Sequence, residues 1–199
     1  MGCLKKIFRA IILALAIIGF LSIGGKDWVA NMWNTHMGKS PQTLMEKAKK
    51  VGDFSQINEE YEIEKASGML GYNGVLAEHK ATGQKMIVVD DHKKPLLTKD
   101  DIISGEIEPK IKSSLGKIKY QSLGLEEFEV TKHGNLYSYG HTIPYARFNA
   151  KVTRFPVGSM SGVVAIAQNK DGEDRILISV NERNKYSQLL AEEFFKNIK

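Results

Sequence analysis

Residues 162–180, GVVAIAQNKDGEDRILISV, decide how the rest of the chain is interpreted. Two apolar runs, at 162–168 and 175–180, flank the polar segment 169–174. Asp171 and Gly172 lie in that segment, and an Asp-Gly pair between two apolar runs is a strong turn signal. The stretch therefore predicts two antiparallel strands joined by a short turn.

Further strands are predicted on the N-terminal side of this stretch. They lie at residues 72–80 and 84–90 around a loop at 81–83, at residues 125–132 and 136–142 around a tight turn at Gly134 and Asn135, and at residues 146–152. The last segment alternates apolar and polar side chains, which is typical of a half-buried strand. Together these runs predict an antiparallel sheet.

Two helices are expected to pack on this sheet. Thr98 is a good N-cap for the first, which Pro109 is expected to kink or split. Its apolar stripe recurs at i, i+4 and consists of Ile103, Ile107 and Ile111. The second helix begins near residue 184, and its stripe consists of Tyr186, Leu190, Phe194 and Ile198. The predicted fold class is α+β: an antiparallel sheet packed by an internal helix and a C-terminal helix, preceded by one N-terminal hydrophobic helix.

The order of these elements resembles that of the PsbP-like domains. The resemblance covers residues 60–199, with a hairpin, a helix, a run of antiparallel strands and a C-terminal amphipathic helix. It includes the ending, a strand at 175–180 followed by a helix at 186–198. It implies an α+β domain like those of bacterial lipoproteins and photosystem extrinsic subunits. No family motif is matched residue for residue, so it implies no functional residue. A cystatin-like cone is also compatible, although its long helix normally comes first.

The N-terminal segment carries the clearest signal in the chain. Three basic residues, the last of them Arg9, precede residues 10–25, which carry no charge and are rich in Ile, Leu and Ala. That length lies between the core of a signal peptide, about 7–15 residues, and a spanning helix of about 20. Trp28 and Trp33 lie where an interfacial aromatic belt would be. Both interpretations, an uncleaved anchor or a cleaved signal, place the rest of the chain outside the cytoplasm.

The chain is expected to divide into three parts. Residues 1–27 form the membrane anchor or signal segment, residues 28–54 a connector, and residues 55–199 an extracytoplasmic α+β domain. The connector contains a short amphipathic helix, which Ser40 and Pro41 begin, since serine is a good N-cap and proline fits a first turn.

Composition and charge narrow the class of partner. The net charge is +5, but residues 1–27 hold four basic side chains against one acidic, 4 − 1 = +3. The remainder, with 24 basic and 22 acidic side chains, offers no basic field for phosphates, so no nucleic-acid partner is expected. Cys3 is the only cysteine, which leaves the predicted exported domain free of thiols.

No motif indicates catalysis. Residues 37–40, MGKS, resemble the end of a P-loop, but Trp33 stands where the loop needs its first glycine. Residues 158–162, GSMSG, place Met160 where a nucleophile elbow needs serine. The predicted hairpins hold the histidines of each hairpin too far apart to share a metal. We therefore expect no enzyme, with no catalytic residue, no cofactor and no metal site.

One group of mostly aromatic side chains is a candidate site. Tyr137, Tyr139 and His141 alternate along one predicted strand, so they share a face. The predicted register places Phe128 opposite them. With two residues of the next strand, the candidate ligand or partner surface consists of Phe128, Tyr137, Tyr139, His141, Tyr145 and Arg147. On an open face this group would bind a ligand or partner, and under a helix it would be core.

These signals predict a single-pass membrane protein that binds rather than catalyses. The C-terminal domain lies outside the cytoplasm, or is secreted if the N-terminal segment is cleaved. The expected partners are the membrane, through the N-terminal helix, and an envelope protein for which the domain acts as an adapter. The alternative is a small-ligand or lipid-binding envelope protein that uses the aromatic sheet face.

Overall fold

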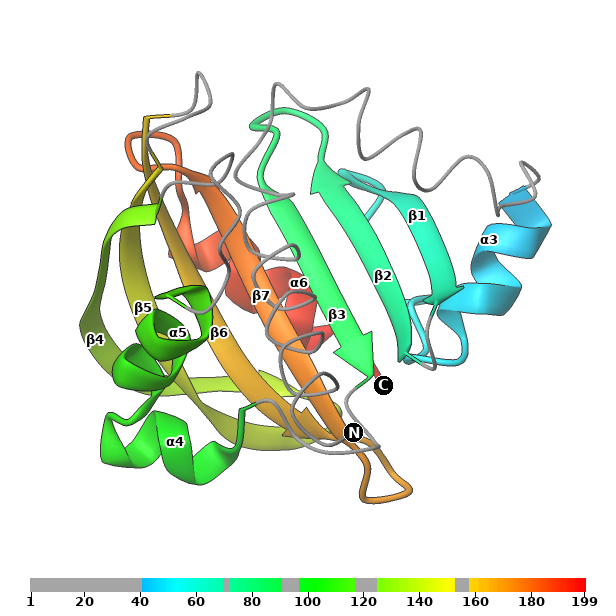
Figure 1. The fold of residues 1–199 in the computed structure, drawn as a ribbon. Coiled ribbons are helices and arrows are strands. Elements are labelled where there is room, and N and C mark those ends of the chain that lie inside the picture. Colours follow the sequence, from blue (N-terminus) through cyan, green and yellow to red (C-terminus); the bar gives the residue numbers. More distant parts are fainter. Residues whose placement is uncertain (1–40, 70–71, 91–96, 117–124, 153–157) are drawn as a thin grey trace.

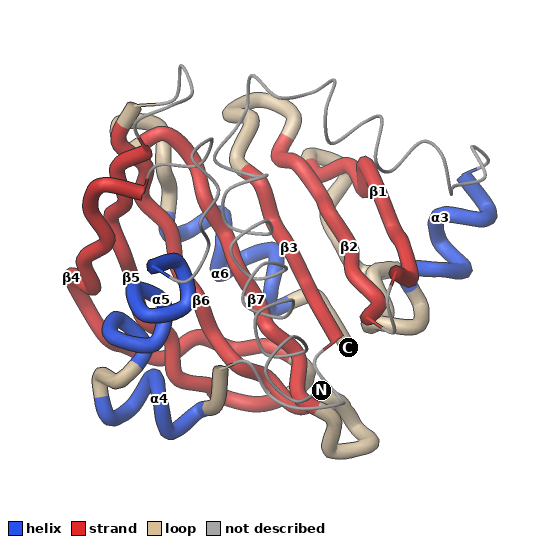
Figure 2. Tube along the Cα trace, viewed as in Figure 1, coloured by secondary structure: helices blue, strands red, loops and turns tan. Residues whose placement is uncertain are grey.

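The computed structural model describes residues 41–69, 72–90, 97–116, 125–152 and 158–199. They form an α+β fold with one seven-stranded antiparallel sheet and a few short helices (Figures 1 and 2). This confirms the predicted class and the antiparallel sheet. The helix predicted over residues 10–25 lies outside the described residues. Among the helices that are described, none combines the length and the apolar character needed to cross a bilayer.

The sheet is built from hairpins that follow one another in the chain. Its strands are β1 (Tyr61–Met69), β2 (Tyr72–His79), β3 (Lys85–Asp90), β4 (Leu125–Ser138), β5 (His141–Val152), β6 (Ser159–Gln168) and β7 (Asp174–Glu182). Their order across the sheet is β1-β2-β3-β7-β6-β5-β4. The hairpin predicted from residues 162–180 is confirmed, and it lies at the centre of the sheet, where β7 pairs with both β3 and β6.

The central strands are buried on both faces, which explains their unbroken apolar sequence. In β7, Ile176 and Ile178 point to one face and Leu177 to the other, and none is more than 1% exposed. A strand that meets water on one face alternates apolar and polar residues, whereas one covered on both faces does not need to.

Four helices are described: α3 (Pro41–Ala48), α4 (Lys99–Ser104), α5 (Ile107–Gly116) and α6 (Gln188–Lys196). In Figure 1, α4 and α5 lie in front of the sheet and α6 lies behind it. The core on the first face includes Ile102, Ile107, Ile111, Phe148 and Val164. The core on the second face includes Val88, Tyr145, Leu177, Phe194 and Phe195. Ala48, Val51 and Phe54, from the stretch that we expected to be a connector, also belong to the second core.

The first predicted helix is two helices, and glycine rather than proline separates them. Thr98 and Asp101 form the expected capping box at the start of α4. The helix ends at Gly105, whose φ of +80° is left-handed, and Pro109 lies in the first turn of α5, where proline is tolerated. Because the break resets the helical phase, the predicted stripe was wrong at Ile103, which is 70% exposed, whereas the preceding isoleucine is buried.

The turn between β4 and β5 is the main correction to the predicted strands. The predicted turn at Gly134 and Asn135 lies inside β4, and the chain turns at Tyr139 and Gly140, whose φ angles are +49° and +81°. Two central residues with positive φ are typical of a type I′ hairpin turn. Gly134 serves close packing instead: a Cβ there would lie 2.7 Å from the ring of Tyr145 on the paired strand.

Strand β1 was not predicted, because the alternation of apolar and charged residues in its sequence, YEIEKASGM, ends after four residues. It is an edge strand, and the pairing with β2 is interrupted by an irregularity between Ile63 and Lys65. Charged residues and bulges on an edge strand discourage pairing with other chains. The features that hid β1 from the sequence are therefore those that suit its place in the sheet.

Candidate functional site

The six residues of the predicted aromatic surface do not form one cluster. Phe128 faces α5 and stacks on Phe148, with ring centroids 5.1 Å apart. Tyr139 and Tyr145 are buried on the opposite face of the sheet. Tyr137 is 46% exposed and its hydroxyl donates to a backbone carbonyl in the turn.

The position of the turn explains this separation. It lies five residues beyond the predicted one, so His141, which is exposed, pairs with Ser138 rather than with Phe128. Phe128 pairs with Ala150 near the other end of the hairpin. The predicted register was therefore wrong, and with it the shared face.

Tyr145 and Arg147 do lie on the same face, and the structure adds a third residue to them. The guanidinium of Arg147 lies over the ring of Tyr186, with its central carbon 5.4 Å from the ring centroid. Tyr186 comes from the turn that precedes α6. Arg147 is half-buried, and within the described part of the chain it is in no ion pair. This arginine–tyrosine pair, Arg147 and Tyr186, is what the structure retains of the predicted surface.

Two buried polar atoms at the start of α6 have no hydrogen-bond partner among the described residues: the hydroxyl of Tyr186 and the side-chain oxygen of Gln188. Burial raises the pKa of Tyr186 above its ordinary value, although the charge of Arg147 acts in the opposite direction. Buried polar atoms are normally bonded, so such a pair of atoms needs an explanation. A bound group with a donor for the amide oxygen would supply one.

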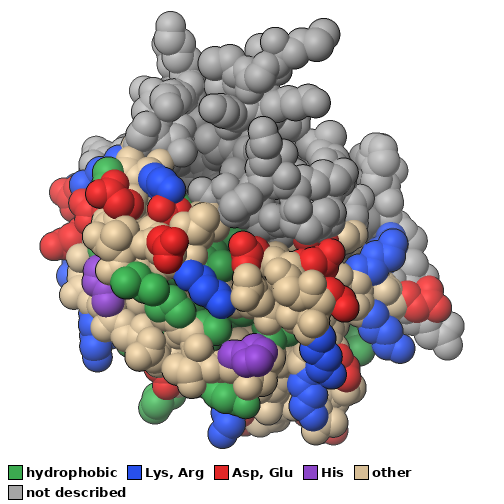
Figure 3. All heavy atoms as spheres, turned by 90° about the horizontal axis from the view of Figure 1, so that it is seen from below, with side chains coloured by type: hydrophobic (Ala, Val, Ile, Leu, Met, Phe, Trp, Pro, Cys, Tyr) green, Lys and Arg blue, Asp and Glu red, His purple; other side chains and the backbone are tan. Residues whose placement is uncertain are grey.

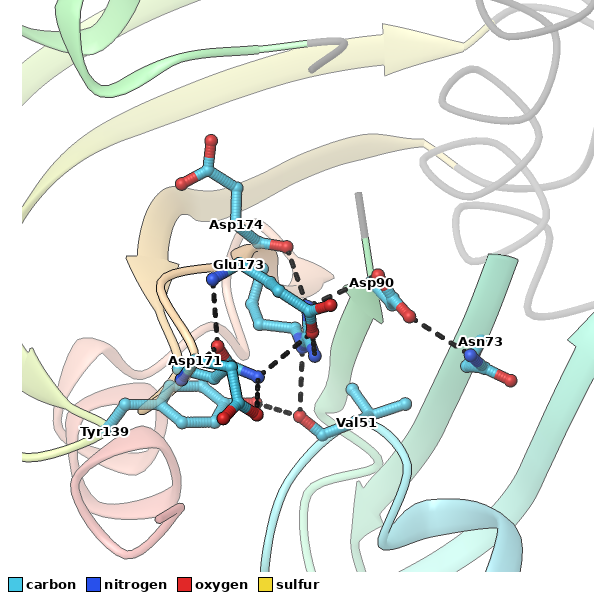
Figure 4. Close-up of polar contacts among 9 residues, drawn as sticks. Val51, Asn73, Asp90, Tyr139, Asp171, Glu173 and Asp174 are labelled. Atoms are coloured by element: carbon cyan, nitrogen blue, oxygen red, sulfur yellow. Dashed lines mark hydrogen bonds and ion pairs between the residues drawn. The ribbon is translucent and has the colours of Figure 1, made fainter. Parts of the chain in front are cut away.

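The most extensive buried polar group surrounds Arg175, at the start of β7 (Figure 4). Arg175 is only 2% exposed. Its Nε donates to the carbonyl of Val51 at 3.1 Å, and its Nη1 donates to Asp90 Oδ1 at 3.3 Å. Nη1 also donates to the carbonyl of Asp174 at 3.1 Å, and Nη2 to Glu173 Oε2 at 2.8 Å. Both ends of the guanidinium and its Nε are thus bonded to protein.

Further polar groups complete this arrangement, the arginine centre. Asn73, from β2, donates to Asp90 Oδ2 at 3.0 Å. The hydroxyl of Tyr139 donates to the carbonyl of Val51 at 2.8 Å, so that carbonyl accepts two bonds. The hydrogen bond from Arg175 lowers the pKa of Glu173, whereas burial raises the pKa of Tyr139. The contacts with Val51 and Asp90 join segments that are distant in the sequence, whereas those with Asp174 and Glu173 are local.

The segment that follows α3 and the residues that follow α6 meet at the same corner. Asp53 donates its N–H to the carbonyl of Lys199 at 2.7 Å, and Lys199 donates back to Asp53 at 3.2 Å. The N–H of Tyr139 donates to the carbonyl of Ile198 at 3.1 Å. At Gly52, a Cβ would lie 2.8 Å from side-chain atoms of Ile198 and of Tyr139, so this close approach requires glycine. The arginine centre therefore holds residues 51–53 against the sheet.

This chemistry is structural rather than reactive. A guanidinium that is buried and bonded on all sides cannot reach a substrate, and its charge is matched by Asp90 and Glu173. Sequence reasoning missed the centre, but a signal exists. Asp90 ends one apolar strand and Arg175 begins another, and opposite charges at such ends meet if the strands are antiparallel neighbours.

A second buried polar network lies at the other end of β7. Gln84 is fully buried and donates to Ser179 at 2.9 Å and to the carbonyl of Ser187 at 2.8 Å. The N–H of Ser187 donates back to its side-chain oxygen at 2.8 Å. This network fixes the start of α6 on the sheet.

Among the described residues, no group of three His, Cys, Asp or Glu side chains could hold a metal ion.

Comparison with known proteins adds no relative. No family model matches the chain, and no curated protein matches it either.

Proposed function

We propose that this chain is a membrane-anchored, extracytoplasmic binding domain that acts as an adapter and not as an enzyme. The observation that carries the proposal is the uncharged run at residues 10–25, preceded by basic residues and followed by a folded domain that begins at α3. Basic residues on one side of an apolar segment favour retention of that side in the cytoplasm. The PsbP-like resemblance, with its exported domains, remains part of this proposal.

The way the domain is held together supports a tethering role. The chain enters the domain through residues 51–53, which the arginine centre and the backbone pairing with Lys199 hold in place. A domain tied in this way presents its other surfaces in a defined orientation relative to its tether. An anchor also raises the local concentration of the domain near membrane partners.

Cysteine labelling of intact cells tests on which side of the membrane the domain lies, because the chain carries its own control. Cys3, the only cysteine, precedes the apolar run and is expected inside. Lys170→Cys adds one thiol in the exposed turn between β6 and β7. A membrane-impermeant maleimide should label the Lys170→Cys variant in intact cells and the parent only after lysis. Labelling of neither protein before lysis would place the domain in the cytoplasm and refute the proposal.

Cross-linking in cells tests the adapter role. The tagged chain should capture one recurrent envelope protein, and reversing the charge of a contact residue should abolish the capture without unfolding the domain. Arg147→Glu is the variant of choice, because the half-buried side chain of Arg147 makes a cation–π contact that contributes only about 0.5–2 kcal/mol. Its matched control is Arg183→Glu, which reverses an exposed charge beyond the end of β7. Loss of capture in both variants would show a general charge effect instead.

The arginine–tyrosine pair favours a second candidate function, binding of a small ligand. Arg147 offers a cation that no described carboxylate neutralises, and the hydroxyl of Tyr186 and the oxygen of Gln188 are without partners there. A ligand with an anionic group and a hydrogen-bond donor would complement these atoms. Such a ligand should raise the melting temperature by mass action, and Arg147→Glu should remove the shift.

A further inference from the structure

We infer that one corner of the domain, made of five lysines, docks on an anionic lipid surface next to the tether. The inference rests on the membrane anchor proposed above and adds the orientation of the domain on the bilayer. The lysine corner consists of Lys47, Lys49, Lys50, Lys196 and Lys199.

The fold brings these lysines together from both ends of the domain. Lys47 lies in the last turn of α3, and Lys49 and Lys50 follow it directly. Lys196 ends α6, and Lys199 pairs through its backbone with Asp53. Lys199 and Lys49 both lower the pKa of Asp53 through their charge, after the hydrogen bonds from Ser55, so both lie near that carboxylate.

The lysine corner is rich in free charge. Four of the five lysines are exposed and Lys47 is half-buried, and among the described residues none of them is in an ion pair. Elsewhere on the described surface some lysines are held by carboxylates, as Lys85 is by Glu78 and Lys112 by Glu108, whereas others, such as Lys132 and Lys170, are exposed singly. In Figure 3, several Lys and Arg side chains lie on the side of the molecule where Figure 1 places α3.

The distribution of charged residues along the sequence also concentrates positive charge at the corner. Residues 41–54 and 196–199, which contain the corner, together hold five basic and two acidic side chains, 5 − 2 = +3. Residues 55–195 hold 18 basic and 20 acidic side chains, 18 − 20 = −2. An anionic surface would therefore attract the corner and repel the rest of the domain, which is an orienting force.

The tether brings the corner within reach of the bilayer. Fifteen residues, 26–40, separate the apolar run from the start of α3. At about 3.3–3.6 Å per residue they span at most about 54 Å, so the corner stays at high effective concentration near the headgroups. Met45, on α3 beside the corner, is 38% exposed and could insert at the lipid interface. A tethered basic surface and an anionic membrane are complementary in charge, which favours lipid over a protein partner.

The test uses the full chain with Cys3→Ser and one reporter cysteine, incorporated into vesicles that carry an acceptor dye on their headgroups. Gln56→Cys places a donor dye near the corner, and Asn184→Cys places one beyond the opposite end of β7. Vesicles of phosphatidylcholine alone are compared with vesicles of phosphatidylcholine and anionic phosphatidylglycerol, whose negative surface potential attracts basic residues. Energy transfer from the donor at position 56 should rise on the anionic vesicles and fall again at 0.5 M salt, where screening is short-ranged, on the order of a few ångström.

Charge-neutralised variants identify the surface. Lys49→Gln, Lys50→Gln and Lys199→Gln together should lower the docked fraction at least about tenfold, since each lysine near an anionic surface contributes to the attraction. The control, Lys132→Gln, Arg183→Gln and Lys185→Gln, removes the same charge elsewhere and should leave energy transfer unchanged.

Vesicle flotation separates the two proposals. If the chain floats with both vesicle types but shows equal energy transfer on each, the docking inference is wrong and the anchor stands. If it floats only with anionic vesicles and the corner variant abolishes flotation, the corner binds lipid and the anchor proposal fails. If it floats with neither, both are overturned.

Discussion

Replacing Arg175 by methionine should destabilise the domain more than any other single change at a charged position. Arg175 and Asp90 are 2% and 3% exposed at their side chains and lie 3.3 Å apart, so the variant removes a cation that lies against a buried carboxylate. Breaking a buried pair by removing one partner costs about 3–5 kcal/mol. The carbonyls of Val51 and Asp174 also lose a donor. For a domain of this size a loss of that order lowers the melting temperature by about 10–20 °C.

Chemical denaturation of the full chain in detergent, followed by circular dichroism, measures this loss. The surface pair Lys185–Glu182, 3.0 Å apart and about half exposed, provides the matched control. Lys185→Met should cost less than about 1 kcal/mol, because water screens that pair. The double variant Arg175→Met with Asp90→Asn should recover part of the loss, since the side chain that faced Arg175 is then neutral.

Two results would refute this reasoning. A loss below 1 kcal/mol in Arg175→Met would show that water or a rearranged carboxylate solvates Asp90. A double variant that is as unstable as the sum of the two single variants would show that the pair is not coupled.

Three further predictions concern packing and pH. Gly134→Ala should lower the free energy of unfolding by about 1–3 kcal/mol through overpacking, because the added methyl would lie 2.7 Å from a tyrosine ring. Gly74→Ala, whose methyl would lie 3.6 Å from its nearest neighbour, should cost much less in the same urea titration. Phe128→Ala should cost about 3–5 kcal/mol of stability, since the side chain is buried, whereas Tyr137→Ala should cost less than about 1 kcal/mol. Equal losses would contradict the placement of the two rings. Asp101 is partly buried, which alone would raise its pKa, but hydrogen bonds from Lys110 and Thr98 bring the pKa below the usual 3.8. The ionised carboxylate therefore stabilises the fold at neutral pH, and this contribution is lost as pH falls through the folded-state pKa. The difference in free energy of unfolding between the parent and Asp101→Asn should narrow from pH 7 to pH 3. A difference that stays constant would contradict this prediction.

The sequence predicts this fold well where burial is two-sided or turns are tight. Apolar runs around Asp171-Gly172 gave the central hairpin, and Thr98 marked the start of α4. It fails where a residue type serves another purpose than the one it usually signals. Gly134 is required for close packing against Tyr145 and not for a turn. Because the sequence analysis placed the turn there, it predicted the wrong register and assigned residues from two faces to one surface.

The candidate site was less predictable than the fold for a physical reason. A strand face is set by register, and register depends on the position of one turn. Arg147 lies on the same face as Tyr145, as predicted, because the strand that carries both was predicted correctly. Tyr186 comes from a loop, and no local sequence pattern reveals how that loop packs. Arg175 was invisible as a centre because its partners come from residue 51, from β2 and β3, and from the turn before β7.

The pairing of Asp53 with Lys199 has a mechanical consequence. If the N-terminal segment anchors the chain as proposed, tension would reach the sheet through α3 and residues 51–53 and pass from Val51 through Arg175 into β7, the middle of the sheet. The strand pairs among β4, β5 and β6 lie outside that path. Under a steady pull, α3 and the segment up to Phe54 would then be expected to detach before the sheet unfolds.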